Sequence, residues 1–195
     1  MILFSLCVVS KNPTFRYFQI PEGFNIVDIH QPIVQECFEF SKEQCPKFID
    51  ELRGPHSIVL LHAWKRITSE GQYVAIEVFR LRQKYLVTIF LPNNQTENKY
   101  IYKFNVLNSE SPSGSTYVEP SEEVLEETMS AVKKQFGEES SLINIISFKT
   151  IMQVDTIGYL PINVNTPQGR KLLDVRLCCK FGEEDFHFKS LEVIE

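Results

Sequence analysis

The strongest constraint on the fold is a pattern that runs through the sequence twice, a helical segment followed by four segments typical of β-strands. The first copy covers 32–107 and the second covers 121–195. Equivalent residues recur at an almost constant separation, as in the pairs Pro32 and Pro120, Gly71 and Gly158, and Lys84 and Lys171. Because one helix and one antiparallel sheet can each bury the apolar face of the other, the repeat predicts two units of helix on sheet.

The strand-like segments are rich in β-branched and aromatic residues, which fit a pleated, half-buried surface. The connections between them are short, as antiparallel hairpins require. We expect strands over 57–67, 73–81, 84–91 and 100–106 in the first copy, and over 142–154, 159–164, 171–180 and 186–194 in the second.

The two helical segments differ in how clearly the sequence marks their ends. Apolar residues recur at helical spacing over 32–52, but Pro46 falls inside this segment. Proline removes a helical hydrogen bond and clashes with the preceding turn, so we expect a kink or a restart there. The second helix is better defined, because Ser121 is a suitable N-cap, Glu122 stands in the first turn and Gly137 follows the last one.

These elements predict an α+β chain with two lobes, each a long helix packed on a four-stranded antiparallel sheet, and an N-terminal strand extension. The predicted boundaries are 1–31 for the extension, 32–107 for the first lobe, 108–120 for a linker and 121–195 for the second lobe. The linker is assigned from its Ser, Pro, Glu and Gly content. Within the extension, 2–9 and 14–20 are expected to form strands.

The hairpin of the second copy has a local motif. Ile146-Ser147-Phe148-Lys149 leads into Gln153-Val154-Asp155-Thr156-Ile157-Gly158. This arrangement is similar to the Gln-Val-Val-Ala-Gly hairpin of cystatins, with one residue more. In the first copy the corresponding loop is 67–71, where only the glycine is retained. The order of the elements resembles the cystatin fold, and two such units joined by a linker resemble latexin-like proteins, which implies a carboxypeptidase inhibitor.

Two departures from the cystatin pattern limit what the resemblance implies. Cystatins that block papain-like enzymes also use a Pro-Trp pair in their second hairpin. Here Pro92 is followed by Asn93, and 182–185 contains no tryptophan. Direct inhibition of a papain-like peptidase is therefore not expected from the resemblance, whereas the latexin-like interpretation does not depend on that pair.

The function predicted on this basis is a non-enzymatic, protease-inhibitor-like or protein-interaction module that presents hairpin loops to a protein partner such as a peptidase, because exposed loops commonly carry binding residues. The candidate partner-binding residues are Ser69, Glu70, Gly71, Gln153, Val154, Asp155, Thr156, Ile157 and Gly158. Two alternatives stay open. One is a structural scaffold subunit of a larger complex, and the other is a tandem hot-dog-type thioesterase that would use Glu51 or Glu127.

No catalytic, metal or cofactor motif stands out, so we expect no enzyme activity, no metal and no cofactor. The four histidines are far apart and have no partner at a zinc-binding spacing. A net charge of −5 without a Lys/Arg-rich block argues against a nucleic-acid partner. The longest apolar run, 1–9, is too short to cross a bilayer.

The compartment is predicted from the cysteines. The odd set of five has no metal spacing, and Cys178 and Cys179 are adjacent in an expected strand, where their side chains point to opposite faces and cannot pair. Reduced thiols favour the cytoplasm. The alternative is secretion, because 2–9 has the length of a signal-peptide core and Asn94-Gln95-Thr96 is a glycosylation acceptor.

Overall fold

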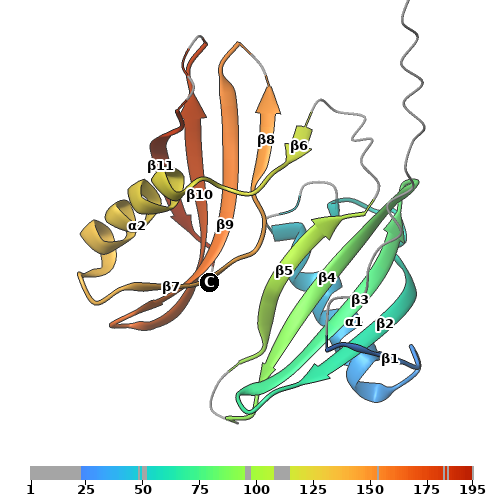
Figure 1. Cartoon of the computed structure of the whole chain (residues 1–195). Coiled ribbons are helices and arrows are strands. Elements are labelled where there is room, and N and C mark those ends of the chain that lie inside the picture. The colour runs from blue at the N-terminus through green and yellow to red at the C-terminus, as the bar shows by residue number, and fades with distance from the viewer. Residues whose placement is uncertain are drawn as a thin grey trace, which may run out of the picture.

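The computed structural model describes residues 23–47, 49, 52–94, 98–107, 115–152, 154–181, 183 and 185–194. Two antiparallel sheets lie beside each other (Figure 1). The first sheet has the order β1-β2-β3-β4-β5, with β1 Asn25–Val27, β2 Val59–Ile67, β3 Gly71–Arg80, β4 Gln83–Pro92 and β5 Tyr100–Val106. The second has the order β11-β10-β9-β8-β6, and β7 pairs with another part of β9. Its strands are β6 Ser115–Tyr117, β7 Ser141–Ile145, β8 Lys149–Met152, β9 Thr156–Thr166, β10 Gly169–Cys179 and β11 His187–Val193.

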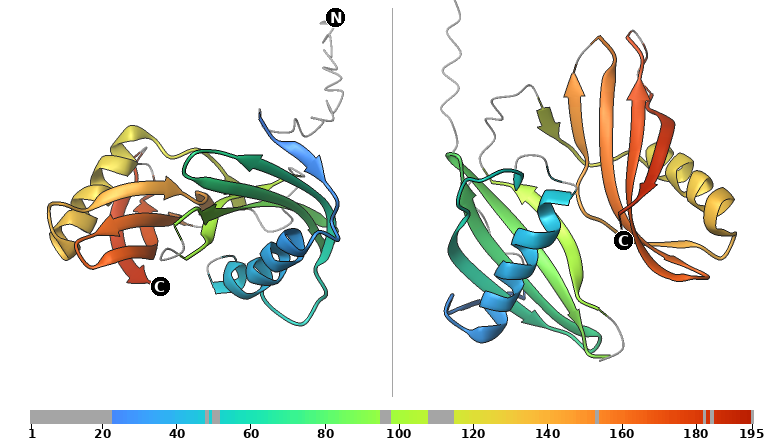
Figure 2. Two further views of the ribbon diagram at one scale, coloured as in Figure 1. Left: turned by 90° about the horizontal axis from the view of Figure 1, so that it is seen from below. Right: turned by 180° about the vertical axis from the view of Figure 1, so that it is seen from behind.

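One α-helix accompanies each sheet (Figure 2). Helix α1 spans Pro32–Gln44 and continues into a 3₁₀ turn, Cys45–Lys47. Pro46 explains this end, because its ring nitrogen cannot donate the next helical hydrogen bond. Helix α2 spans Glu122–Phe136. The predicted N-cap of α2 is confirmed, since the hydroxyl of Ser121 accepts a hydrogen bond from the backbone N–H of Val124.

The predicted fold class is wrong. Strands account for 51% of the described residues, the two α-helices have only 13 and 15 residues, and the sheets have five and six strands instead of four. Three local features cause the difference. Pro46 ends the first helix early, the short strands β1 and β6 add to the sheets, and the expected strand over 142–154 is interrupted at 146–148, so that it forms β7 and β8.

The predicted positions of several individual strands are confirmed. The four strands expected in the first copy correspond to β2, β3, β4 and β5, with ends that differ by at most two residues. In the second copy the strand expected over 159–164 is longer, because β9 already begins at Thr156. The division into an extension, two lobes and a linker stays a prediction, and β6 lies inside the segment predicted as linker. The strands expected over 2–9 and 14–20 fall outside the described residues.

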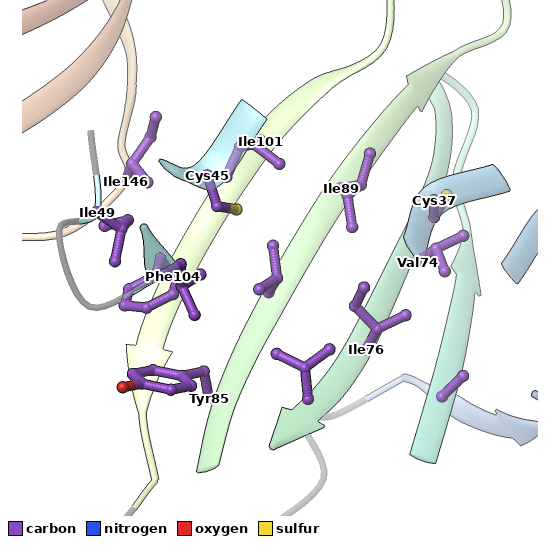
Figure 3. Packing of buried hydrophobic residues seen from close by; sticks show 14 of the residues in the cluster. Cys37, Cys45, Ile49, Val74, Ile76, Tyr85, Ile89, Ile101, Phe104 and Ile146 are labelled. Atoms are coloured by element: carbon purple, nitrogen blue, oxygen red, sulfur yellow. The ribbon is translucent and has the colours of Figure 1, made fainter. Parts of the chain in front are cut away.

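The first hydrophobic core lies between α1 and one face of the first sheet (Figure 3). Val34 and Cys37 of α1 are fully buried against this face. The strands contribute alternate residues, as expected for side chains that point to one side of a pleated sheet. They are Val74, Ile76 and Val78 of β3 and Val87 and Ile89 of β4. β5 adds Ile101 and Phe104, which lie three residues apart because the register between β4 and β5 shifts between Thr88 and Ile89.

The second core packs α2 on the second sheet in the same manner. Val124 and Val132 of α2 lie against Leu160, Ile162 and Val164 of β9 and against Leu173, Val175 and Leu177 of β10. The two cores are not independent. Ile146 and Leu172, which come from the second half of the chain, are buried in the first core, and Figure 3 shows Ile146 near Phe104. Apolar packing therefore links the two sheets.

Hydrogen bonds also link the sheets, along the outer edge of β5. The backbone N–H of Phe104 donates to the carbonyl of Ile146 at 2.9 Å. The side-chain amide of Asn163 donates to the carbonyl of Ile101 at 2.9 Å and to Oδ1 of Asn144 at 3.1 Å, and the amide of Asn144 donates to the carbonyl of Tyr102. An edge strand exposes unpaired backbone groups. Here, groups from the second half of the chain form hydrogen bonds with backbone groups of three residues of β5, Ile101, Tyr102 and Phe104.

A charged group lies on the other face of the first sheet, opposite α1. Glu77 of β3 is 6% exposed, its Oε1 lies 2.8 Å from Nζ of Lys84, and its Oε2 lies 2.8 Å from Nδ1 of His62. Burial opposes ionisation of this carboxyl, but the hydrogen bonds from Lys84 and His62 outweigh it, so that the pKa of Glu77 is lowered from its ordinary value of 4.5.

This pKa shift predicts an acid-dependent contribution to stability. A lowered folded-state pKa means that ionised Glu77 stabilises the fold above its unfolded pKa, and that this contribution is lost as the pH falls through the folded-state pKa. Glu77→Gln should lower the free energy of unfolding by about 2 kcal/mol at neutral pH, and progressively less as the pH falls below 4.5 towards the lowered folded-state pKa. Urea unfolding across this pH range measures the difference. Glu119→Gln is the matched control, because that side chain is 88% exposed. An equal loss of stability at all pH values would contradict the prediction.

Candidate functional site

The two hairpin turns at one end of the second sheet lie next to each other. One turn connects β8 to β9 and contains Val154 and Asp155, and the other follows β10 and contains Phe181 (Figure 1). The backbone N–H of Phe181 donates a hydrogen bond to Oδ1 of Asp155 at 3.1 Å. The Asp155 carboxylate therefore connects the turns, which we call the paired tips: residues 154–157 and 179–181.

Each paired tip exposes a large apolar side chain. Val154 is 83% exposed and Phe181 is 85% exposed, the highest values among the large apolar residues of the described chain. Single exposed apolar residues are common on protein surfaces. Here two of them lie on adjacent turns that a hydrogen bond joins, and apolar side chains exposed together are typical of a surface that contacts another protein.

The base of the paired tips is tightly packed. The Cβ of an alanine at Gly158 would lie 2.7 Å from Cε2 of Phe148 and 3.2 Å from Cε1 of Phe186. The rings of Phe148 and Phe186 meet edge to face, with their centroids 5.5 Å apart. Gly158 thus lets β9 approach this aromatic pair, which supports both turns from below. Only glycine permits this approach without displacement of a ring.

Three acidic residues lie near Cys179 of the paired tips. Burial raises the pKa of the Cys179 thiol, and the nearby carboxylates of Glu183, Asp185 and Asp155 raise it further. The thiol of Cys179 also donates to the carbonyl of Glu183 at 3.2 Å. Since the thiolate is the nucleophilic form of cysteine, a thiol held protonated in this way is poorly suited to covalent catalysis.

The structure does not bring the two predicted hairpins together. Ser69 and Glu70 lie in the turn between β2 and β3, and Figure 1 shows that turn at the opposite end of the molecule from the turn between β8 and β9. Their carbonyls accept hydrogen bonds from Asn93, from its side-chain amide to Ser69 and from its backbone N–H to Glu70, both at 3.0 Å. Gly71, also predicted, begins β3 next to that turn.

The predicted residues of the second copy that the structure describes belong to the paired tips or their base. Val154 and Asp155 lie in the turn, and Thr156, Ile157 and Gly158 begin β9, whereas Gln153 lies outside the described residues. The sequence did not indicate Phe181 as a site residue, because residues in turns do not follow the apolar periodicity that identifies helices and strands. A weak signal was present, since this phenylalanine stands in a polar, Gly-containing turn where no core position is expected.

The next question is whether the part of the chain that the structure describes could hold a metal ion or the thioesterase glutamates. It contains no group of three or more His, Cys, Asp or Glu residues that could hold a metal ion. Of the two glutamates considered for a thioesterase, Glu51 lies outside the described residues, and Oε1 of Glu127 accepts a hydrogen bond from the backbone N–H of Phe188 at 2.9 Å. That bond gives Glu127 a structural role, the attachment of α2 to β11. None of the described helices is long and apolar enough to span a bilayer.

Comparison with known proteins adds little to this geometry. No family model matches the chain, and no curated protein matches it at a significant level. Among solved structures, the chain is similar to mouse fetuin-B, with a TM-score of 0.34 and 8% sequence identity over 89% of this chain and 71% of that chain. A similarity at this level assigns neither a fold nor a function. The resemblance to cystatins and latexin-like proteins stays a prediction, as does the compartment.

Proposed function

We propose that this chain is a protein-binding module that inhibits a peptidase, and that the paired tips form its contact edge. The observation that carries the proposal is the side-by-side exposure of Val154 and Phe181 on two turns joined by the hydrogen bond from Phe181 to Asp155. A narrow, apolar edge of this kind can enter a concave site such as a peptidase cleft, because apolar clefts bind projecting apolar side chains.

Preorganisation supports the proposal. The ordering of loops on binding reduces affinity, so a contact surface that is already held in place binds more tightly. The Asp155 carboxylate joins the two turns, and Gly158, at the start of β9, packs closely on the ring of Phe148. The edge that we propose therefore needs little ordering when it meets its partner.

The test is an inhibition assay with carboxypeptidase A and papain. We expect the purified chain to inhibit at least one of them at micromolar concentration. Val154→Asp combined with Phe181→Asp should weaken this inhibition by about a hundredfold, since two central apolar anchors are lost and each tenfold corresponds to about 1.4 kcal/mol.

The matched control is Ile67→Asp. Ile67 is also apolar and 69% exposed, but it lies at the end of β2, in the first sheet. This substitution should leave inhibition unchanged. Failure of the wild-type chain to inhibit either enzyme would remove the inhibitor proposal, and full inhibition by the double variant would remove the paired tips from it.

A further inference from the structure

The two turns that form the paired tips carry an excess of negative charge. In their sequence, 153–157 and 179–186, four residues are acidic and one, Lys180, is basic. The structure describes three of the acidic residues, Asp155, Glu183 and Asp185. Asp155 lies in one turn and the other two lie in the second turn, so both turns contribute to the charge.

The three described carboxylates lie close to one another and to the exposed apolar residues. Burial raises the pKa of the Cys179 thiol, and the carboxylates of Glu183, Asp185 and Asp155 raise it further, so that all three lie within electrostatic range of one sulfur atom. Asp155 also follows Val154 in the chain, and its Oδ1 lies 3.1 Å from the backbone nitrogen of Phe181. Negative charge therefore adjoins the apolar part of the paired tips.

Ion pairs leave most of this charge in place in the part of the chain that the structure describes. Asp155 accepts its hydrogen bond from a neutral backbone N–H, and none of the ion pairs between described residues includes Asp155 or Asp185. Oε2 of Glu183 lies 3.8 Å from Nε2 of His187, but a histidine cancels a negative charge only in its protonated form.

Basic residues near the turns offset little of the charge. Lys180 is exposed and can offset one carboxylate. Arg176 of β10 is already paired, with its Nε 3.5 Å from Oδ2 of Asp174. On β11, the carboxylate of Glu127 binds the backbone N–H of the residue before Lys189, so that this lysine also has an acidic neighbour. Three described carboxylates against one lysine leave two negative charges in excess.

We propose that the partner of the paired tips presents an apolar pocket bordered by lysine or arginine side chains. Val154 and Phe181 would fill the pocket, while the carboxylates of Asp155, Glu183 and Asp185 would face the basic side chains at its rim. Protein interfaces commonly have this arrangement, with an apolar centre inside a polar rim whose charges complement those of the partner. This assignment rests on the proposed function, because it takes the paired tips as the contact edge, and it adds the charge that the partner's cleft must carry.

The same charge disfavours two other occupants of the paired tips. A second copy of the chain, docked through its own paired tips, would place carboxylates against carboxylates. Nucleic acid and anionic lipid would be repelled for the same reason. Charge complementarity therefore selects a protein with a basic rim.

The first test measures binding in the absence of a peptidase. It uses a fluorescein-labelled peptide of about twelve residues in which lysine alternates with Leu and Phe. Fluorescence anisotropy should show binding to the wild-type chain that weakens as salt is added, because ion pairs between exposed groups are screened. The same peptide with glutamate at every lysine position should not bind.

Two variants separate the charged from the apolar contribution. Asp155→Asn, Glu183→Gln and Asp185→Asn together remove the three charges and should weaken binding of the basic peptide about tenfold. Asparagine at 155 keeps the oxygen that accepts the N–H of Phe181, so the turns stay joined in this neutralised variant. Val154→Ser with Phe181→Ser keeps the charges and should also weaken binding, because the apolar side chains are lost.

The matched control is a triple variant with the same net charge as the neutralised variant. It combines Glu119→Gln, Glu138→Gln and Glu139→Gln, three exposed carboxylates outside the two turns. This control should bind the basic peptide as the wild type does. It separates the paired tips from a general attraction between a basic peptide and a chain of net charge −5.

The second test uses whichever of carboxypeptidase A and papain the wild type inhibits. Inhibition should weaken as salt is added, and the neutralised variant should inhibit about tenfold more weakly, with a slower association rate. The control triple variant should inhibit as the wild type does.

The outcomes separate this inference from the proposed function. Binding of the basic peptide that the neutralised variant loses, with no inhibition of either peptidase, would remove the inhibitor proposal and support the basic partner. Inhibition that neither salt nor the neutralised variant weakens would support the inhibitor proposal and overturn the basic rim. The basic rim would also be overturned by no binding of the basic peptide, by equal binding of the basic and acidic peptides, or by an equal loss in the neutralised variant and its control.

Discussion

Replacement of Gly71 by alanine is expected to lower the free energy of unfolding by about 3 kcal/mol, near the upper end of the range for overpacking. The reason is steric and involves the backbone. A Cβ at this position would lie 2.3 Å from the carbonyl oxygen of Leu91 and 2.8 Å from the ring of Phe90. Gly71 pairs with Pro92 at the first position of the β3–β4 ladder, so that the two strands must separate to admit the methyl group.

The measurement is urea unfolding of the wild type and the variant, followed by circular dichroism. Ser69→Ala in the same turn is the control, because Ser69 is exposed and its substitution should change stability by less than about 0.5 kcal/mol. A loss of less than about 1 kcal/mol for Gly71→Ala would show that β3 and β4 do not approach as closely as described.

The second large effect is expected at Asn163. This residue is 2% exposed, and its amide bonds to both the carbonyl of Ile101 and the side chain of Asn144. Asn163→Ala leaves both acceptors without this donor in a buried interface, where each lost partner costs about 1–3 kcal/mol. We expect a total loss of about 3 kcal/mol.

The location of Asn163 makes a further prediction about cooperativity. Because its hydrogen bonds join the second sheet to β5, the wild type should unfold in one transition, whereas Asn163→Ala should weaken the coupling between the sheets and broaden or split that transition. Differential scanning calorimetry measures this. Asn165→Ala is the matched control, since Asn165 lies on the same strand and is exposed. One sharp transition of unchanged Tm in the Asn163 variant would contradict this role.

The sequence predicted regular elements well wherever one local signal dominated. High β-branched and aromatic content with short connections located β2 to β5, and Ser121 together with Gly137 located the ends of α2. The features that it missed have weak local signals. β1 and β6 contain three residues each, too few to show alternation, and β6 lies in a segment whose composition predicts a linker. These omissions and the early end of α1 made the predicted fold class wrong.

The candidate site was predicted only in part, because the pairing of its two turns depends on contacts between distant parts of the sequence. The residues around Val154 could be selected because they stand between two strands and next to a glycine. That their turn lies beside the turn of Phe181, instead of beside Ser69, depends on the order of strands in the second sheet. Hydrogen bonds such as those of Asn163 to the edge of β5 are likewise long-range, and a single sequence gives no information about such pairs.

The most direct test of the paired tips as a contact edge is to locate the residues of this chain that a partner contacts. Hydrogen–deuterium exchange should be measured for the chain alone and in complex with a peptidase that the assay proposed above shows it to inhibit. We predict slower exchange in the turns around Val154 and Phe181, and no change in the turn that contains Ser69 and Glu70. Protection of that opposite turn, or a complex in which neither Val154 nor Phe181 lies in a protected segment, would contradict the paired tips as the contact edge.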